Sequence, residues 1–523
     1  MATLYEENTK FPSVDLGYAR YQPDYHESGG YYDFQNIRYA APPTGNRRFQ
    51  PPVPVSQAED HELRAPETTT PPQAVPAWVR GTEDWSDRGT EDCCKVPVLV
   101  WLYGGGYTAG SKELFGSGAG LLARAAKPMI YVALNYRLGI FGFLGGPDYI
   151  DQGGTSNLGL LDQRFGLEWV QEHISLFGGD PDEVTVMGQS AGGGSILHQI
   201  TAYGGSQGPS PFKRAVLQSP GFYPITSPEV MNRDFRCLLE HAKCESLEEL
   251  KMLSGQELKV ANLAVIDTAP YGQFLLGPVV DGTFVPDLPG RLLLDGQFDK
   301  DLDIMLGQCF NEGGDYVEPV DISEDYMSKY LDRTFSSISL DTKNHIMSDL
   351  YPPADGSNEQ ALALRGHLGF SSMAPFYSTP TARLQRLISD AVYIQHNNAL
   401  SQAFREQNFN YLWSASEGRH GADLAYTFYA EDEPPIPVLP PVKSQYLAHA
   451  LQKYITNFVI SGDPNGENDD GLPTMERRGQ NGLVLEIRDD GFKQTSDPSD
   501  KEQCAWWQQN PLWETPVPAT EQR

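Results

Sequence analysis

The stretch from Asp180 to Ser195 constrains the fold more than any other part of the chain. A short β-branched run, Val184 to Met187, leads into Gly-Gln-Ser-Ala-Gly and then into small residues that can begin a helix. A strand, a sharp turn at a serine and a helix, in that order, form a nucleophile elbow. Such a turn is so tight that the residues two before and two after the serine must lack bulk, and both are glycine. Ser190 is therefore the predicted nucleophile.

The same five-residue pattern occurs a second time, around Ser206. With 51 glycines in 523 residues, such a match arises easily by chance. No strand pattern precedes this second match, and Pro209 and Pro211 oppose a long helix after it. We therefore expect Ser206 in a surface loop.

The composition favours a large globular protein and argues against polyanionic partners. Hydrophobic residues make up 40% of the chain and aromatic residues 11%, which is ample for a buried core and excludes global disorder. The net charge of −30 opposes binding to nucleic acid or to an anionic membrane surface. We expect neither partner, and the sequence does not indicate an oligomeric state.

Several features favour a cytoplasmic location. No apolar run approaches the ~20 residues of a membrane span. The segment from Met1 to Phe11 is polar and acidic and lacks the apolar region of a secretory signal, and no Asn-x-Ser/Thr site is present. Cys237 and Cys244 could bridge a short loop, but free thiols are expected in a reducing compartment. The six cysteines are at positions 93, 94, 237, 244, 309 and 504.

Strand and helix patterns alternate along most of the chain. Apolar runs of strand length, typical of strands buried on both faces, occur at 96–103 and 129–137. Further strands are expected at 214–219, 303–307 and 410–413. Helical spacing occurs at 161–173 and 446–460. This alternation predicts an α/β fold with a doubly wound, mostly parallel central sheet flanked by helices.

The remaining segments are interpreted as additions to this sheet. Residues 1–33 suggest a short antiparallel lead-in, 34–45 a strand that runs into a proline-rich turn, and 53–90 an irregular loop. Residues 225–300 and 320–405 contain helical patterns suited to a lid or pocket wall, and the tail after 464 is polar. Because no internal repeat or linker is visible, we predict one domain over residues 1–523.

A serine nucleophile needs two partners, which the chain supplies in the expected order. An imidazole must accept the hydroxyl proton, and a carboxylate must orient the imidazole. In α/β-hydrolases the order along the chain is Ser, acid, His. Glu312 and His420 fit this order, since each follows a predicted strand in a loop with an adjacent glycine. We predict a catalytic triad of Ser190, Glu312 and His420.

The glycine triplet 104–106 follows the predicted strand at 96–103. The oxyanion that forms on attack needs two or three N–H donors aimed at one point. Glycines after a buried strand allow backbone N–H groups to face a ligand without an intervening Cβ. Gly105, Gly106 and Ala191, the residue after the nucleophile, are the predicted oxyanion hole; the simpler alternative is that the triplet only forms a turn.

At this point the chain resembles the type-B carboxylesterases, the cholinesterase-like branch of the α/β-hydrolases. The resemblance implies hydrolysis of small-molecule carboxylic esters through an acyl-enzyme at Ser190, without a cofactor or a metal. It also implies that Ser219 is a buried helper near the triad, and that Arg48–Glu91 and Arg137–Asp162 are structural ion pairs. The matching stretches are Ile37–Ala40, Arg48-Phe49, Glu91–Cys93, Tyr103–Tyr107, Asn135–Gly139, Asn157–Gln163, Phe177–Pro181, the elbow, Asn311–Gly313 and His420-Gly421.

Three departures from this family pattern stand out. The family usually has a strand of roughly a dozen residues between Glu-Asp-Cys and the strand before the glycine triplet, whereas here Cys93 is followed only by Cys94 and Lys95. That strand would border the one at 98–103. Either another segment fills its place, or a deletion or a wrongly joined exon leaves backbone groups there unpaired. The family's cysteine partner upstream of Cys93 is also absent. Gln189 stands before the nucleophile where choline-ester hydrolases carry Glu, which argues against a choline substrate.

Four functional hypotheses remain. The leading one is a serine hydrolase of carboxylic esters, with Ser219 and Gln189 next to the triad. The second is an acyl-transfer or cyclising enzyme of secondary metabolism that uses the same site. The third is an adhesion or scaffold protein, although the inactive relatives typically lack the nucleophile. The fourth is a poorly active truncated member. Tyr426-Thr427-Phe428 and the N-terminus suggest a resemblance to intracellular members from filamentous fungi.

Overall fold

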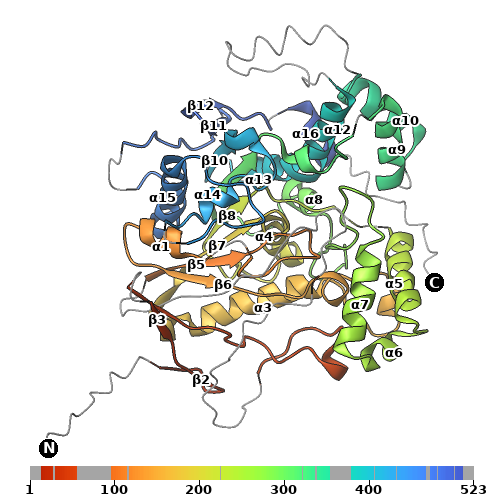
Figure 1. The fold of residues 1–523 in the computed structure, drawn as a ribbon, viewed down its shortest axis with the longest axis horizontal. Coiled ribbons are helices and arrows are strands. Elements are labelled where there is room, and N and C mark those ends of the chain that lie inside the picture. The colour runs from red at the N-terminus through yellow and green to blue at the C-terminus, as the bar shows by residue number, and fades with distance from the viewer. Residues whose placement is uncertain are drawn as a thin grey trace, which may run out of the picture.

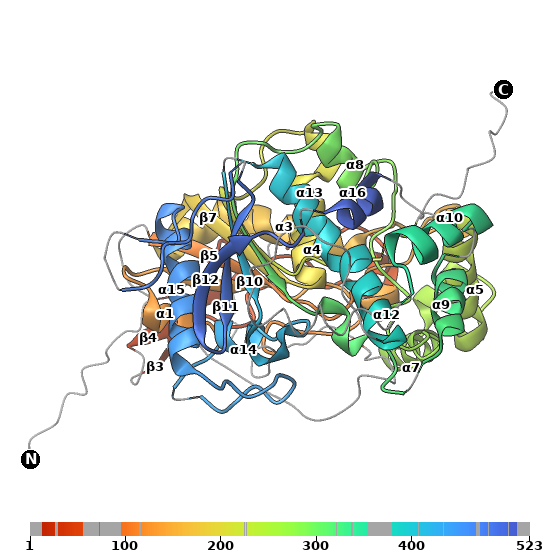
Figure 2. The ribbon, with the colours of Figure 1, turned by 90° about the horizontal axis from the view of Figure 1, so that it is seen from above.

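A sheet of eight strands runs through the computed structural model, with helices on both faces (Figures 1 and 2). The strand order is β12-β11-β10-β9-β8-β7-β5-β6. All neighbours are parallel except β11 and β12, which form an antiparallel pair. The predicted fold class is therefore confirmed. The structure describes residues 13–26, 30–55, 73, 96–114, 117–223, 225, 227–320, 322–335, 338–353, 379–405, 407–431, 433–466, 471–479, 481–499 and 501–509.

The strands form because their sequences are apolar on both faces or nearly so. β5, β8 and β10 are buried along almost their whole lengths, as parallel strands covered by helices on both sides must be. The sequence predicted β5 to β10 and missed β11, which pairs in parallel with β10. The eight strands are β5 Val96–Leu102, β6 Ile130–Ala133, β7 Gly179–Gln189, β8 Arg214–Gln218, β9 Asp303–Cys309, β10 Asn408–Trp413, β11 Leu483–Arg488 and β12 Gly491–Ser496.

Strand β5 has a partner on each side. Val98 pairs with Ile130 of β6 and with Val184 of β7. The expectation that a missing strand would leave β5 unpaired is therefore wrong, because β6 already fills that side. Among the described strands, β6 is the outermost one at this end of the sheet. The short connection at Cys93–Lys95 lies outside the described residues.

Two groups of helices cover the sheet. Figure 2 shows α3 (Leu158–His173) and α4 (Ala191–Ile200) on one face, and α1 (Ala119–Arg124) with α15 (Gln445–Ser461) on the other. Buried Leu160, Leu167 and Val170 of α3 recur at helical spacing and join the main hydrophobic core. The predicted helices at 161–173 and 446–460 are confirmed, each with slightly wider bounds.

Helical insertions lie to one side of the sheet (Figure 1). A second hydrophobic cluster lies within them and includes Leu331, Leu350, Leu384 and Trp507. The expected lid-like helices are thus present, although residues 354–378 lie outside the described part of the chain. The insertion elements are α5 Pro228–Ala242, α6 Leu247–Met252, α7 Gly255–Ile266, α8 Pro289–Leu294, α9 Glu324–Thr334, α10 Leu340–His345, the π-helical turn η6 Ile346–Leu350, α12 Pro380–Ile388, the π-helical turn η8 Ser389–Ile394 and α13 Gln395–Ala403.

The two ends of the chain show one confirmed prediction and two errors. The antiparallel lead-in is confirmed, since β1 (Val14–Asp15) pairs with β2 (Arg20–Tyr21) and β3 (Asp24–His26) with β4 (Tyr31–Asp33). The strand predicted at 34–45 is wrong, because the chain there is irregular before a 3₁₀ turn. The polar tail after 464 is not featureless, since it forms β11, β12 and helix α16 (Glu502–Gln509).

Short helical turns connect these elements.

None of the helices in the described ranges combines the length and the apolar character that a membrane crossing requires. The expected irregular loop at 53–90 lies almost entirely outside the described residues. The short elements are α2 Pro147–Ile150, α14 Leu424–Thr427 and the 3₁₀ turns Gly45–Arg47, Gly139–Phe141, Ile174–Phe177, Ala202–Gly205, Glu312–Asp315 and Ala415–Gly418.

Candidate active site

The turn between β7 and α4 has the geometry of a nucleophile elbow. Ser190 has φ +56° and ψ −124°, a conformation that a non-glycine residue adopts only under strain. A Cβ on Gly192 would lie 1.9 Å from the Leu102 carbonyl oxygen, and one on Gly188 would lie 2.6 Å from the Gly192 carbonyl carbon. Both glycines are therefore required by space, as the sequence predicted. The turn presents Ser190 to a pocket.

The backbone of Ser190 is tied to the end of β8. Its N–H donates to the Gln218 carbonyl at 2.9 Å, and the Gly221 N–H donates to the Ser190 carbonyl at 3.1 Å. These bonds hold the strained turn against its neighbouring strand. Ser206, by contrast, is exposed, and its hydroxyl donates to the Tyr203 carbonyl. The surface assignment of Ser206 is confirmed.

Glu312 and His420 meet although 108 positions separate them. His420 Nδ1 lies 2.6 Å from Glu312 Oε2, and the Cys309 N–H donates to Glu312 Oε1 at 2.6 Å. The carboxylate is fully buried, so its two oxygens face fixed partners. A carboxylate at Nδ1 favours the tautomer with its proton on Nδ1 and leaves Nε2 as an acceptor.

The loops that carry these two residues are also joined through their backbones. They follow the neighbouring parallel strands β9 and β10, and the Asn311 N–H donates to the Gly418 carbonyl at 2.7 Å. The same strand ends that face the elbow therefore bring the acid and the imidazole together. This is the arrangement that the order Ser, Glu, His along the chain predicted.

The second imidazole nitrogen faces the residue before the nucleophile. Gln189 Nε2 lies 3.3 Å from His420 Nε2. Within the described residues, Ser190 and His420 do not hydrogen-bond to each other. The structure thus joins the acid to the imidazole and places that imidazole beside the elbow. Catalytic hydrogen bonds are often long in structures without substrate and form only when the substrate binds.

The predicted oxyanion-hole residues surround Ser190. A Cβ on Gly104 would lie 2.8 Å from the Ser190 Cβ, so the glycine loop after β5 contacts the nucleophile directly. Gly105 and Gly106 both have positive φ, at +119° and +60°. Ala191 follows Ser190 and begins helix α4, where backbone N–H groups are not used within the helix. The expected residues are therefore gathered at one place.

A pocket of about 330 Å³ opens onto Ser190. Phe274 and Tyr393 approach two of its glycines so closely that a Cβ on Gly106 or Gly221 would lie 2.1 Å or 2.2 Å from their rings. None of the described residues that line the pocket carries a charge at neutral pH. They are Gly106, Tyr107, Ser190, Gly221, Phe222, Tyr223, Phe274, Leu276, Gly277, Val392 and Tyr393.

Ser219 is buried beneath the acid rather than in contact with it. It has φ +46°, and its N–H donates to the Gly307 carbonyl at 2.8 Å. Its buried hydroxyl has no hydrogen-bond partner among the described residues. The thiol of Cys309, the residue whose N–H donates to Glu312, lies nearby. Burial, aided by the nearby Asp423 and Glu312, raises the pKa of the Cys309 thiol well above its usual value. Cys309 is therefore a neutral packing residue.

Sequence reasoning missed a buried carboxyl three residues after His420. Asp423 accepts a hydrogen bond from the Tyr411 hydroxyl at 2.6 Å and one from Gln218 Nε2 at 3.2 Å. Burial raises the pKa of Asp423 to about 6, although the Tyr411 hydrogen bond opposes the shift. This network supports the floor of the site. No local pattern around Asp423 could have revealed it, because its partners come from other strands.

The other predicted contacts give a mixed result. Arg137 and Asp162 form a buried ion pair at 2.6 Å, as the resemblance implied. Arg48 instead donates to the carbonyls of Lys251 and Leu253, and its expected partner Glu91 lies outside the described residues. The possible bridge between the two cysteines at 237 and 244 is not formed. Within the described ranges, no group of three His, Cys, Asp or Glu side chains could hold a metal ion.

Comparison with known proteins agrees with this geometry. Residues 19–507 match the family model described as "Carboxylesterase family". The chain therefore belongs to the carboxylesterase family, and it is a carboxylic-ester hydrolase. The predicted family is confirmed.

Relatives of known sequence extend over nearly the whole chain. "Carboxylesterase patB" of Aspergillus clavatus is 33% identical, over 95% of this chain and 96% of that protein. "Carboxylesterase patB" of Penicillium expansum is 31% identical, over 96% of each chain. A "Secreted lipase" of Arthroderma benhamiae is 31% identical, over 79% of this chain and 78% of that protein.

Solved structures confirm the fold. Aspergillus niger EstA superimposes with a TM-score of 0.77 at 24% identity, over 95% of this chain and 98% of that one. A PNB esterase superimposes with a TM-score of 0.72 at 23% identity, over 94% and 98% of the two chains. Because the sequence identity to both structures is below 25%, the similarity shows a shared α/β fold.

Proposed function

We propose that Ser190, Glu312 and His420 are the catalytic triad of this ester hydrolase. The observation that carries the proposal is the 2.6 Å contact between Glu312 and His420, made beside a strained serine turn. A buried carboxylate on Nδ1 makes Nε2 a better base and stabilises the imidazolium that forms on proton transfer. Gln189, the residue before Ser190, contacts this nitrogen at 3.3 Å.

The reaction follows from these roles. His420 Nε2 accepts the proton of Ser190, whose Oγ attacks the ester carbonyl and forms a tetrahedral intermediate. His420 then passes the proton to the leaving alcohol, and water cleaves the acyl-enzyme by the same route. Because Gln189 occupies Nε2 before the reaction, a small rotation of its amide must precede proton transfer.

We assign the oxyanion hole to the N–H groups of Gly105, Gly106 and Ala191. Gly106 lines the same pocket as Ser190, and the adjacent Gly104 lies against the Ser190 side chain. Donors fixed in advance in this way stabilise the developing charge without reorganising. Losing one such donor costs about 3–4 kcal/mol of transition-state stabilisation.

The pocket favours small, neutral esters with an apolar acyl or alcohol group. Aromatic and aliphatic side chains line it, and the residue before the nucleophile is an amide rather than a carboxylate. A cationic choline ester would find no charged partner among these lining residues.

Three further assignments stay predictions. We retain one domain over residues 1–523, a cytoplasmic location and the absence of a nucleic-acid partner, the last on the basis of the net charge of −30. Some relatives are named as secreted lipases, so location is best tested by fractionating cells that express a tagged chain. Acyl transfer or cyclisation at the same serine is not favoured, because the family is one of ester hydrolases.

A panel of aryl and alkyl esters with graded acyl lengths tests the proposed function. Ser190→Ala should lower kcat by at least about 10³-fold, since a triad loses nearly all of its effect with its nucleophile. Ser206→Ala is the matched control, because this exposed serine has the same flanking glycines. Full activity in Ser190→Ala, or an equal loss in both variants, would reject the assignment.

A further inference from the structure

A π-helical turn, η8, lies between α12 and α13 and contacts the acid loop, His420 and Gly221. Within it, the Gln395 N–H bonds to the Asp390 carbonyl five residues earlier. Such turns are rare and occur frequently at functional sites. All six of its residues are buried. Its side chains therefore act on neighbouring elements and not on solvent.

The first residue of the turn holds the loop of the acid. The Gly313 N–H, next to Glu312, donates to Ser389 Oγ at 2.8 Å, and Ser389 Oγ donates to the Gln385 carbonyl at 2.8 Å. Gln385 Nε2 also donates to the Gly314 carbonyl at 3.2 Å. The approach is close, since a Cβ on Gly313 would lie 2.0 Å from the Gln385 oxygen. The backbone of the acid loop is thus attached directly to η8.

The fifth residue of the turn packs on the imidazole and on the serine segment. The ring of Tyr393 lies 4.3 Å from that of His420 and 5.6 Å from that of Tyr316. It also fills the space where a Cβ of Gly221 would be, and the Gly221 N–H binds the Ser190 carbonyl. One short turn therefore contacts the acid loop, the imidazole and the neighbour of the nucleophile.

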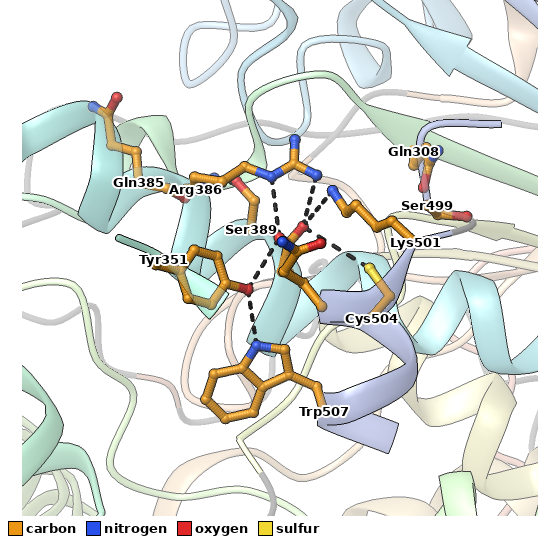
Figure 3. Close-up of polar contacts among 12 residues, drawn as sticks. Gln308, Tyr351, Gln385, Arg386, Ser389, Ser499, Lys501, Cys504 and Trp507 are labelled. Atoms are coloured by element: carbon orange, nitrogen blue, oxygen red, sulfur yellow. Dashed lines mark hydrogen bonds and ion pairs between the residues drawn. The ribbon is translucent and has the colours of Figure 1, made fainter. Parts of the chain in front are cut away.

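The second residue of the turn fastens η8 to the C-terminal helix α16 (Figure 3). Asp390 is fully buried and forms ion pairs with Arg386 at 2.9 Å and with Lys501, just before α16, at 3.0 Å. It also accepts the Tyr351 hydroxyl at 3.0 Å, which in turn accepts the Trp507 indole N–H at 2.9 Å. Removing one partner of such a buried group leaves a charge without compensation.

We propose that Ser389 is a positioning residue for Glu312, and that the anchorage of η8 on α16 through Asp390 keeps the acid and the imidazole aligned. This inference rests on the proposed triad. Ser389 does not touch substrate, and it acts through the Gly313 N–H. The C-terminal helix is then part of the support of the active site, although it lies nearly 90 residues after His420 in the sequence.

The primary test compares Ser389→Ala with Ser401→Ala in the full-length protein. Ser401 is the matched control, because it is equally buried on the following helix and its hydroxyl accepts a hydrogen bond from Asn410 at 2.7 Å. We expect kcat to fall about 10-fold in Ser389→Ala with KM changed less than about twofold, since slight misplacement of a catalytic group acts on the chemical step. Ser401→Ala should keep its kcat. Equal kcat values in the two variants would overturn the proposal.

A spectroscopic readout separates this proposal from the triad itself. The 2.6 Å contact between His420 and Glu312 should give a downfield proton resonance, which Ser389→Ala shifts or broadens and Ser401→Ala leaves in place. This signal is measured without substrate, so it reports on Ser389 even if the esterase assays were to fail. An unchanged resonance in Ser389→Ala would overturn the proposal. Loss of activity in Ser190→Ala tests the triad independently.

Two further variants extend the test. If Ser389→Ala does not fold, Gln385→Met removes the other polar link to the acid loop and should give a smaller fall in kcat of the same kind. Asp390→Asn should lower kcat and move the resonance, whereas Asp162→Asn, which alters an equally buried ion pair on α3, should lower stability alone. A resonance that both Asn variants leave unchanged would show that the anchor does not reach the triad.

Discussion

At the scale of single residues, the position of Gln189 decides what the imidazole contacts before the reaction. Its amide lies 3.3 Å from His420 Nε2, and its side chain also lies close to Gly104 and Gly421. An amide that donates to Nε2 uses that nitrogen as an acceptor, which is also its role when it takes a proton from Ser190. A carboxylate at the same place would favour the protonated form.

Gln189→Glu should therefore move the acid limb of the pH profile of kcat/KM to higher pH, by about one unit. The physical reason is that a nearby carboxylate stabilises the imidazolium ion. Gln189→Met, which removes the amide without adding charge, is the control and should not produce this upward move. A profile for Gln189→Glu that coincides with the wild type would contradict the assigned contact.

Phe274 is the residue that most clearly limits the pocket. Its ring occupies the space above Gly106, where a Cβ would come within 2.1 Å of it. Phe274→Ala should raise kcat/KM for long acyl esters relative to acetyl esters, by roughly 10-fold, because one or two methylenes in an apolar pocket are worth about 1–3 kcal/mol. The ratio of rates within one variant cancels any loss of folded protein. An unchanged ratio would place the acyl group elsewhere.

The residues of the proposed triad carry signals in the sequence, whereas their supports do not. Ser190 stands out by a strand followed by close glycines, and Glu312 and His420 by their order along the chain. Ser389 and Tyr393 carry no such local signal, because their importance comes from contacts with residues 76 and 27 positions away. Helical spacing indicates that such residues are buried but not what they touch.

At the scale of elements, α4 and α13 meet through two buried histidines that enclose Phe222. His198 of α4 and His396 of α13 lie 4.6 Å and 4.1 Å from the Phe222 ring. Burial lowers the pKa of His198 to about 4, although the Gly194 carbonyl opposes the shift. Burial, and then the nearby His198, lower the pKa of His396 to about 3. Both side chains are therefore neutral in the folded protein at neutral pH.

This pair should make the fold sensitive to acid. The unfolded chain binds protons at these histidines below pH 6.5 while the folded chain does not, so their contribution to stability is complete above pH 6.5 and is lost as the pH falls toward 4 and 3. At pH 5, protonation of each histidine in the unfolded chain should lower the free energy of unfolding by about 2 kcal/mol relative to pH 8. Urea unfolding at pH 8 and at pH 5 measures this loss.

The comparison of variants isolates the two histidines. His396→Gln should reduce the difference in stability between pH 8 and pH 5 by about 2 kcal/mol, even if it is less stable than the wild type at both. His241→Gln, at an exposed position in the last turn of α5, should leave the difference unchanged. Identical pH dependence in His396→Gln and the wild type would contradict the burial of a neutral imidazole.

Elements were predictable where one physical rule dominated. Strand β5 is an almost continuous apolar run, so a sheet buried on both faces is its natural place. The pair β11 and β12 was missed because β12 is polar and partly exposed. Its sequence has no apolar strand pattern, and its backbone pairing with β11 holds it in the sheet. The wrong strand at 34–45 contains Pro42 and Pro43, which cannot donate to a ladder.

At the scale of the whole molecule, the site lies where two hydrophobic cores meet. Phe222 and Leu276 belong to the core of the sheet, whereas Val392 and Tyr393 belong to the core of the helical insertions, and all four line the pocket. The sheet supplies the reacting groups, and the insertions supply the walls and the support through η8. Changes in the insertions can thus alter substrate choice and alignment without touching the triad.

The family pattern indicated the sheet and the site but not the effect of the missing segment. The sequence could not show which strands border β5, because strand order is a property of the folded sheet. In the structure β5 is paired on both sides, with β6 and with β7. The geometry around Ser190 accordingly agrees with an active member of the family.

The most direct test of the triad is to trap the covalent intermediate. The protein is treated with a fluorophosphonate, and the labelled peptide is identified by mass spectrometry. The triad predicts one label per chain, on Ser190, absent from Ser190→Ala and strongly slowed in His420→Ala. A folded protein that stays unlabelled, or a label on any other residue, would contradict it.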